Sequence, residues 1–292
     1  RRPKEYELIS YDISTPDFRK IGTLDIGKKY AHAASHNFDS AYQNGTYHPY
    51  TIFAEYGTGN DEEMYVWKTK NKGATWEKVF TKGARGGNGE IKHFHCVQVD
   101  PFTKDIWLAS GDTDDEAKIW KSIDEGETWQ ELFSGSQHTR TLGFVFEKDA
   151  IYYGMDSPTS DFPSNIYKID RNTMQKVSVG VTKNGWAVYN LTRTFIPKGF
   201  LVFTEYEKAN GSTPGNKYCI EFYNYDTQKM ETVVEFDISQ SSEDYIGVMI
   251  APRYQDMLSS KVFFNPTQGL YNQYTGYVKN IYAPVWSLKL QM

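Results

Sequence analysis

The chain of 292 residues lacks most of the features that assign a protein directly to a class. It has two cysteines, Cys96 and Cys219, which stand too far apart for a zinc or redox motif, so we expect two buried free thiols. Its 37 acidic residues outnumber 32 basic ones, so the composition gives no indication of nucleic-acid binding. No apolar run approaches the roughly 20 residues that cross a bilayer, so we expect no membrane insertion.

Helical periodicity is nearly absent as well. Short stretches rich in Val, Ile, Tyr, Phe and Trp alternate with Gly, Asp, Asn and Ser turns, which is typical of an all-β protein. They recur with a period of roughly 40–50 residues, each unit giving an inner strand a, a hydrophobic strand b, a strand c, a tight turn and a strand d. The b strands are expected at Tyr50–Tyr56, Asp105–Gly111, Ala150–Asp156, Gly199–Tyr206 and Lys261–Asn265. The c strands are expected at Glu63–Lys70, Ala117–Ile123, Asn165–Asp170 and Tyr218–Tyr225, and the d strands at Trp76–Thr81, Trp129–Ser134, Gln175–Val181 and Met230–Asp237.

Two eight-residue segments, Ser122–Trp129 and Thr69–Trp76, share the pattern Ser/Thr-x-Asp/Asn-x-Gly-x-Thr-Trp. Asp124 or Asn71 at the third position suits capping of backbone N–H groups in the turn, and the glycine supplies a positive φ. The final Thr and Trp are expected to begin the next strand and to bury an aromatic ring between sheets.

This pattern resembles the Asp-box, or BNR repeat, of the sialidase-like β-propeller superfamily. The resemblance implies a single β-propeller domain over residues 1–292, with Asp-box turns between strands c and d. Tyr6–Tyr11 and Arg19–Asp25 look like strands c and d, while Tyr245–Pro252 begins a last unit that has only a and b. We therefore expect five blades, one of them shared by the two termini, which would leave no exposed sheet edge.

The segment Tyr271–Met292 fits none of these units, so six blades are the alternative. This remainder and a start at Arg1 rather than Met suggest one part of a longer protein. We expect that protein to be extracellular, at a cell surface or phage-borne. The sequence indicates nothing about its oligomeric state.

In a propeller, the start of strand a and the end of strand b lie on the same face, because the two strands are antiparallel. The candidate site residues stand at these two places. They are His36, His93, His95, His138, Arg140, Trp186 and Tyr189 near the starts of a strands, and Asp112, Asp156 and Glu205 near the ends of b strands. The c–d turns point to the opposite face, so we expect the two octets to be structural.

These residue types suit β-elimination on an acidic polysaccharide or oligosaccharide, a reaction that removes the proton α to a uronate carboxylate. His93 or His95 would act as base or charge stabiliser, because imidazole titrates near neutral pH. Arg140 would bind the substrate carboxylate, and Tyr189 or His138 would be the acid or base. The substrate would be bound further by His36, Trp186, Asp112, Asp156 and Glu205.

Three alternatives stay open. A glycoside hydrolase would use two carboxylates among Asp112, Asp156 and Glu205, about 5–10 Å apart. A divalent metal ion would be held by the histidine cluster, but no diagnostic ligand spacing is present, and the main expectation is that no cofactor is needed. A non-catalytic propeller would instead bind glycans by stacking its aromatic residues on sugar rings. An enzyme is favoured over a binder.

Sialidase chemistry is the reaction that the resemblance first suggests, and the sequence disfavours it. Sialidases use three arginines on the substrate carboxylate, and no Arg-Ile-Pro motif occurs early in this chain. Arg140, Arg193 and Arg253 have the spacing of such a set. However, Arg193 is expected within a strand a rather than at its start.

Overall fold

A computed structural model describes residues 5–12, 17–25, 38–39, 42–43, 46–47, 50–57, 63–71, 73–83, 91–157, 163–195, 197–207, 215–239, 245–250, 261–266 and 286–289. The chain divides into two compact units, Arg1–Arg140 and Thr141–Met292. Among the described residues, no helix is long and apolar enough to cross a membrane. The expectation of one domain over residues 1–292 stays a prediction.

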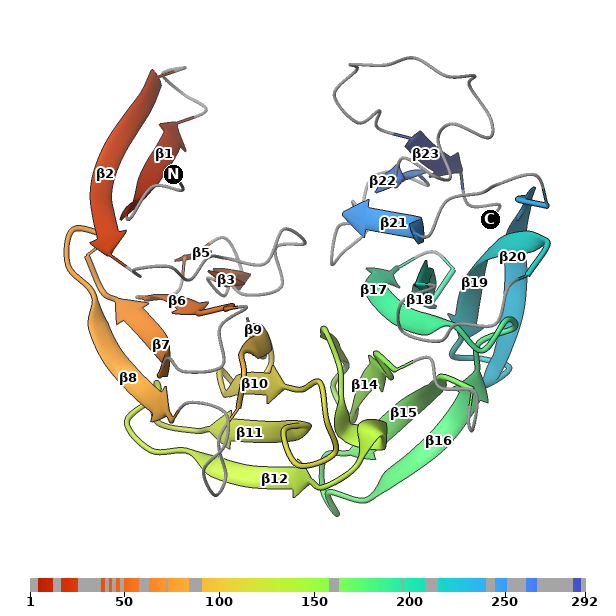
Figure 1. Cartoon of the computed structure of the whole chain (residues 1–292), viewed down its shortest axis with the longest axis horizontal. Helices are drawn as coiled ribbons and strands as arrows, with labels where there is room; N and C mark the ends of the chain where they lie inside the picture. The colour runs from red at the N-terminus through yellow and green to blue at the C-terminus, as the bar shows by residue number, and fades with distance from the viewer. Residues whose placement is uncertain are drawn as a thin grey trace. The chain divides into compact units, whose positions relative to one another are not determined.

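Unit 1 is built from antiparallel sheets whose strands follow one another in the chain (Figure 1). One four-stranded sheet comprises β3 (Phe38–Asp39), β6 (Thr51–Ala54), β7 (Met64–Thr69) and β8 (Glu77–Lys82). The next comprises β9 (Phe94–Val99), β10 (Ile106–Ser110), β11 (Lys118–Ser122) and β12 (Gln130–Ser134). Two hairpins complete the described strands of this unit, β1 (Glu5–Asp12) with β2 (Asp17–Asp25), and β4 (Tyr42–Gln43) with β5 (Thr46–Tyr47).

Unit 2 repeats the same four-stranded order. Its first sheet comprises β13 (Phe144–Phe146), β14 (Ala150–Gly154), β15 (Asn165–Asp170) and β16 (Lys176–Val181). The same order follows in β17 (Ala187–Thr194), β18 (Gly199–Glu207), β19 (Lys217–Asn224) and β20 (Lys229–Asp237), which belong to a seven-stranded sheet. The last residues of β18 also pair with β21 (Tyr245–Ile250), which is followed by β22 (Lys261–Pro266) and β23 (Trp286–Lys289).

The strands expected as b, c and d are all present, and their ends differ from the predicted ones by at most two residues. One expectation needs correction. β22 pairs with β21 on one side and with β23 on the other, so the third strand of the last sheet comes from the C-terminal remainder. The N-terminal hairpin β1–β2 was expected in that place. The number of blades stays a prediction.

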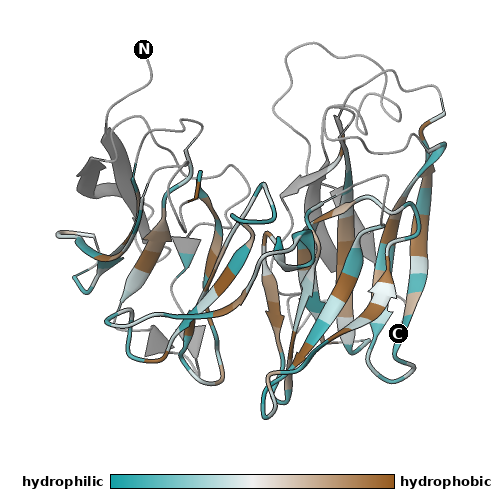
Figure 2. Cartoon of the chain, turned by 60° about the horizontal axis from the view of Figure 1, so that its bottom comes forward, coloured by the Kyte–Doolittle hydropathy of each residue, from teal (hydrophilic) through white to brown (hydrophobic). Residues whose placement is uncertain are grey.

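Strand position within each sheet sets the burial pattern. In unit 1, β9 and β10 are buried along their whole lengths, whereas every residue of β12 is partly or fully exposed. Inner strands that are covered on both faces consist largely of apolar residues, whereas outer strands keep polar positions. The polar positions appear as teal bands in Figure 2. The core between the two four-stranded sheets of unit 1 includes Ile52, Phe94, Leu108 and Trp120. Each such side chain contributes about 1.5–3 kcal/mol by burial.

The two octets fold into the same hydrogen-bonded turn. In the first, Thr69 Oγ1 accepts from the Gly73 amide at 2.9 Å, and Asn71 Oδ1 accepts from the Thr75 amide at 2.9 Å. In the second, Ser122 Oγ accepts from the Gly126 amide at 2.8 Å. Asp124 Oδ1 accepts from the Thr128 amide at 2.9 Å, as the capping role at the third position predicts.

The second turn also fastens the two four-stranded sheets of unit 1 together. Gly126 has φ +92°, and a Cβ there would lie 3.2 Å from Val79 of β8, so only glycine fits without displacing that side chain. The fully buried ammonium of Lys68 in β7 reaches the Glu125 carbonyl at 2.9 Å and the Glu127 carboxylate at 3.1 Å. These contacts support a structural role for the turns.

Candidate functional site

Three chemically active side chains meet where β9 begins and β10 ends. His93 precedes β9, His95 lies within it, and Asp112 follows β10. The antiparallel pairing of these two strands brings the three residues to one edge of the sheet, as the sequence predicted. Phe94 pairs with Ser110 and Cys96 pairs with Ala109, so His95 is the extra residue of a β-bulge. Bulges redirect side chains and often lie beside active sites.

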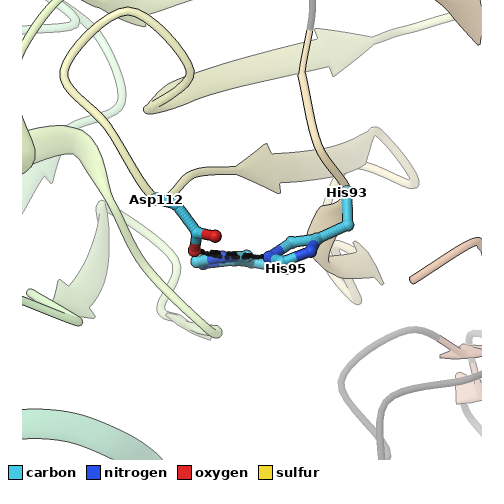
Figure 3. A group of neighbouring side chains, drawn as sticks. All are labelled: His93, His95 and Asp112. Atoms are coloured by element: carbon cyan, nitrogen blue, oxygen red, sulfur yellow. Dashed lines mark hydrogen bonds and ion pairs between the residues drawn. The ribbon is translucent and has the colours of Figure 1, made fainter. Parts of the chain in front are cut away.

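The polar atoms of His93, His95 and Asp112 form a small triangle, here named the His–Asp cluster (Figure 3). Nε2 of His93 lies 3.1 Å from Nε2 of His95. Each of these nitrogens lies 3.4 Å from Oδ1 of Asp112. The imidazoles are buried, with 1% and 2% of their side-chain surface exposed, whereas Asp112 retains 23%.

The ring of His93 is fixed from two sides. Its Nδ1 lies 2.8 Å from the carbonyl oxygen of Gly57, and the ring of Tyr56 stacks on it with centroids 3.9 Å apart. A carbonyl oxygen can only accept, so Nδ1 carries the proton in the neutral ring. The lone pair on Nε2 therefore faces His95 and Asp112.

Two cations adjoin the carboxylate of Asp112, and they are named here the cation pair. Nζ of Lys92 lies 2.7 Å from Oδ2, and Nη2 of Arg140 lies 3.5 Å from Oδ1. Arg140 Nη1 and the side-chain amide of Gln137 also donate to the backbone carbonyl of Asp112, both at 3.3 Å. Lys92 and Arg140 keep 24% and 15% of their side-chain surface exposed, so a ligand can approach both.

Close packing explains why Gly111, rather than a larger residue, precedes Asp112. A Cβ at Gly111 would lie 2.8 Å from Cγ of Arg140 and 3.0 Å from Cε1 of His95. The backbone of Asp112 itself has φ +156°, a conformation that residues other than glycine seldom adopt. Backbone strain of this kind tends to gather at functional sites, where surrounding contacts maintain it.

Charge in the site follows from burial and hydrogen bonding. Burial lowers the pKa of His95 to about 3, so its imidazole is neutral at ordinary pH. Burial by itself would raise the pKa of Asp112, but its interactions with His93 and His95 hold that pKa well below its usual range. Asp112 is therefore an anion between two imidazoles and two cations. Such an arrangement can bind an anion at its cationic side or a metal ion at its nitrogen side.

The other predicted residue of unit 1 that is described is His138. It lies in a short 3₁₀ helix, η1 (Gln137–Thr139), and its side chain is half-buried. Gln137, directly before it in the chain, and Arg140, two residues after it, both contact Asp112. The prediction for His36 falls outside the described residues.

Four predicted residues belong to unit 2. Tyr189 is the extra residue of a bulge between β17 and β18, the counterpart of His95 in its own sheet, and it is 7% exposed. Trp186 is 1% exposed and packs in the core against Tyr206 and Tyr218, which leaves no open ring face for a sugar. Asp156 and Glu205 are buried at 8% and 1% exposure. The roles predicted for these four residues stay predictions.

Arg193 has a structural partner within unit 2. It lies on β17, as the sequence indicated, and its Nη2 pairs with the Glu147 carboxylate at 2.7 Å. Tyr225 donates to the same carboxylate at 2.9 Å. This pairing occupies the guanidinium and gives no support to a sialidase arginine set.

Sequence reasoning missed the groups that surround the His–Asp cluster. Lys92 was not selected, although it stands directly before His93 and has the charge to pair with a carboxylate. Tyr56, Gly57 and Gly111 were also missed. They lie at or just after the ends of the predicted b strands Tyr50–Tyr56 and Asp105–Gly111, so their position was a usable signal.

Comparison with known proteins identifies the class of fold. No model of a known protein family matches the chain, and no curated protein matches its sequence. Solved structures do match in three dimensions. An oligogalacturonate lyase in complex with manganese has a TM-score of 0.59 at 10% identity, over 98% of this chain and 72% of that one. An oligogalacturonate lyase from Vibrio parahaemolyticus has a TM-score of 0.55 at 11% identity, over 89% and 68%.

A third similar structure is a GH74 xyloglucanase from Xanthomonas campestris, with a TM-score of 0.55 at 14% identity. The match covers 75% of this chain but only 33% of the xyloglucanase. At such low identities the likeness concerns the fold alone. Together with the repeated four-stranded antiparallel sheets, it shows that the chain has a β-propeller fold.

Proposed function

We propose that this chain is a carbohydrate-active propeller that binds an acidic polysaccharide or oligosaccharide beside the His–Asp cluster and cleaves it by β-elimination. The observation that carries the proposal is the charge of the site. Two cations, Lys92 and Arg140, share the single carboxylate of Asp112, and His95 is neutral. The excess positive charge favours a ligand that carries a carboxylate, such as a uronate sugar.

The cation pair would recognise and activate the substrate. A guanidinium can hold a carboxylate through two parallel hydrogen bonds, which makes Arg140 the principal contact and Lys92 the second. Elimination builds up negative charge on the same carboxylate as the α proton leaves. Cations already placed there stabilise that charge in the transition state.

We assign the proton transfer to His138 rather than to His93 or His95. The latter two imidazoles are 1–2% exposed, and their Nε2 atoms face each other and Asp112. The imidazoles of His93 and His95 therefore hold Asp112 in position. His138 is half-buried and stands two residues before Arg140 in the chain, so its imidazole is the more accessible acid or base of this region.

Elimination is preferred to hydrolysis because of what surrounds Asp112. In a glycoside hydrolase the two carboxyl groups themselves act as acid, base or nucleophile. In the part of unit 1 that the structure describes, the Asp112 side chain contacts ammonium, guanidinium and imidazole groups. Two similar structures are named as oligogalacturonate lyases, and galacturonate carries the carboxylate that the cation pair would bind.

Membership of the Asp-box propeller superfamily is part of the same proposal. The shared geometry of the two octets supports assignment to the Asp-box propellers. An extracellular or cell-surface setting, where acidic polysaccharides occur, is proposed with it.

The test is incubation of the full chain with a panel of uronate polymers and oligomers while the ultraviolet absorbance of unsaturated uronate is followed. We expect absorbance to rise with the wild type and to be reduced at least about 100-fold in Arg140→Met and His138→Gln. The control is Asp115→Asn, which changes an exposed carboxylate in the loop of Asp112. Release of reducing sugar without absorbance would establish hydrolysis instead, and glycan binding with neither signal would establish a binding protein.

A further inference from the structure

The Nε2 atoms of His93 and His95 and Oδ1 of Asp112 face one another in unit 1 (Figure 3). Their separations are 3.1, 3.4 and 3.4 Å. All three atoms can act as ligands to a cation, since imidazole nitrogens and carboxylate oxygens are common metal ligands in proteins.

These separations match the edges of a metal coordination polyhedron. With metal–ligand bonds of about 2.1 Å, neighbouring ligand atoms stand about 3.0 Å apart in octahedral geometry and about 3.4 Å apart in tetrahedral geometry. The observed edges span this range. A cation placed slightly above the triangle would therefore contact all three atoms without movement of the side chains.

Hydrogen bonds alone satisfy the triangle poorly. The Nε2 atom of His93 is an acceptor, because Nδ1 of that ring donates to the Gly57 carbonyl. Oδ1 of ionised Asp112 is an acceptor as well. The N–H on Nε2 of His95 would have to serve both atoms, and its 3.4 Å separation from Oδ1 is long for a hydrogen bond, as is the 3.5 Å contact of Arg140 Nη2 with Oδ1. A cation would satisfy all three atoms at once.

The surroundings of the triangle resemble the outer shell of a metal site. Metal-binding histidines usually donate their second ring N–H to a carbonyl or carboxylate, as His93 does to Gly57. Lys92 holds Oδ2 of Asp112 at 2.7 Å, which fixes the carboxylate and leaves Oδ1 directed at the triangle. The stacked ring of Tyr56 fixes the plane of His93.

Arg140 competes with a cation for Oδ1 of Asp112. Its Nη2 lies 3.5 Å from that oxygen, which is a long contact. Its Nη1 has another acceptor, the backbone carbonyl of Asp112 at 3.3 Å. The guanidinium therefore keeps a partner when Oδ1 is taken by another cation.

The geometry points to a three-ligand site for a divalent transition-metal ion, formed by His93, His95 and Asp112. Two nitrogens and one oxygen suit Zn²⁺, Mn²⁺, Fe²⁺ or Co²⁺, whereas Ca²⁺ and Mg²⁺ prefer oxygen ligands throughout. Because the three protein ligands lie on one side of the ion, its other coordination positions are open to water or to oxygens of a ligand. The site goes beyond the proposed elimination and does not depend on the identity of the substrate.

The test measures metal binding without substrate. The full chain is stripped with a chelator and titrated with Co²⁺, followed by visible absorption, and with Zn²⁺ and Mn²⁺, followed by calorimetry. We expect one ion per chain. His95→Gln and Asp112→Asn should lower the affinity about 100-fold or more, and Lys92→Met about tenfold with unchanged stoichiometry.

Two variants serve as matched controls. Asp115→Asn removes a carboxylate from the same loop, and His138→Gln removes an imidazole outside the triangle, so both should bind metal as the wild type does. A wild type that binds no stoichiometric ion, or equal binding in all variants, would overturn the site. If the ligand variants fail to fold, the Co²⁺ spectrum of the wild type still decides, because it reports nitrogen and oxygen ligands directly.

Discussion

The indole Nε1 of Trp129 donates a hydrogen bond at 3.0 Å to the backbone carbonyl of Val79, 50 residues earlier in the chain. The same N–H also approaches the Gly126 carbonyl at 3.0 Å, so the ring links its own turn to the preceding sheet of unit 1. Trp76 ends the other octet, but its buried Nε1 has no hydrogen-bond partner among the described residues. The two equivalent tryptophans thus differ in one measurable respect.

We predict that Trp129→Phe destabilises the protein more than Trp76→Phe does. Both changes remove a similar apolar volume, but only the first leaves the Val79 carbonyl without its indole donor. The difference should be about 1 kcal/mol in the free energy of unfolding, measured by urea denaturation of both variants. Equal losses would show that the hydrogen bond to Val79 adds nothing to stability.

Lys68 offers a test of the contact between sheets. Its side chain is fully buried, and its ammonium contacts the Glu125 carbonyl and the carboxylates of Glu77 and Glu127. Lys68→Ala should lower the free energy of unfolding by about 2–4 kcal/mol, because it opens a cavity and removes the donor. Lys68→Met retains most of the volume, so it should cost about half as much. A loss below about 0.5 kcal/mol for Lys68→Ala would contradict the fastening role.

The second octet gives an acid-stability prediction. Hydrogen bonds from Thr128 lower the pKa of Asp124 to about 2, from an ordinary value of 3.8. A lowered pKa in the folded state means that the ionised group stabilises the fold above about pH 4, and that this stabilisation is lost as the pH falls toward 2. Asp124→Asn should therefore flatten the decline in urea midpoint between pH 5 and pH 2.

Asn71 supplies the control for that experiment, because it shows that an amide can perform the same capping. Its Oδ1 accepts from the Thr75 amide, and its Nδ2 donates to Thr75 Oγ1 at 2.8 Å. The Asp124→Asn variant should thus remain folded at neutral pH. An unchanged acid profile would mean that other carboxylates control the loss of stability.

Gly111 tests the packing of the His–Asp cluster. In Gly111→Ala, the new Cβ would press on Arg140 and His95, at 2.8 and 3.0 Å. We expect metal affinity and uronate cleavage each to fall about tenfold or more, since small displacements in a site are costly. Gly135→Ala is the comparison. Gly135 has φ +79° but open space around it, so that change should cost about 1 kcal/mol of stability and leave the cluster intact.

Local sequence determined the strands and turns. The alternation of apolar runs with turn residues placed strands b, c and d of the repeated sheets, and the octet pattern placed two turns whose hydrogen bonds involve residues at most four apart. Such features depend on neighbours in the chain, so they can be read from residue order. The same periodicity predicted that His93, His95 and Asp112 would lie together, at the start of one strand and the end of the next.

Tertiary structure alone decided how the site is composed. Sequence separation gives no sign that Lys92 and Arg140, 48 residues apart in numbering, converge on Asp112, nor that His95 occupies a bulge that directs its ring toward His93. The tertiary structure also pairs β22 with β23, a strand that the repeat pattern had left unassigned. These outcomes depend on long-range pairing and on packing within about 4 Å, which hydrophobic periodicity does not encode.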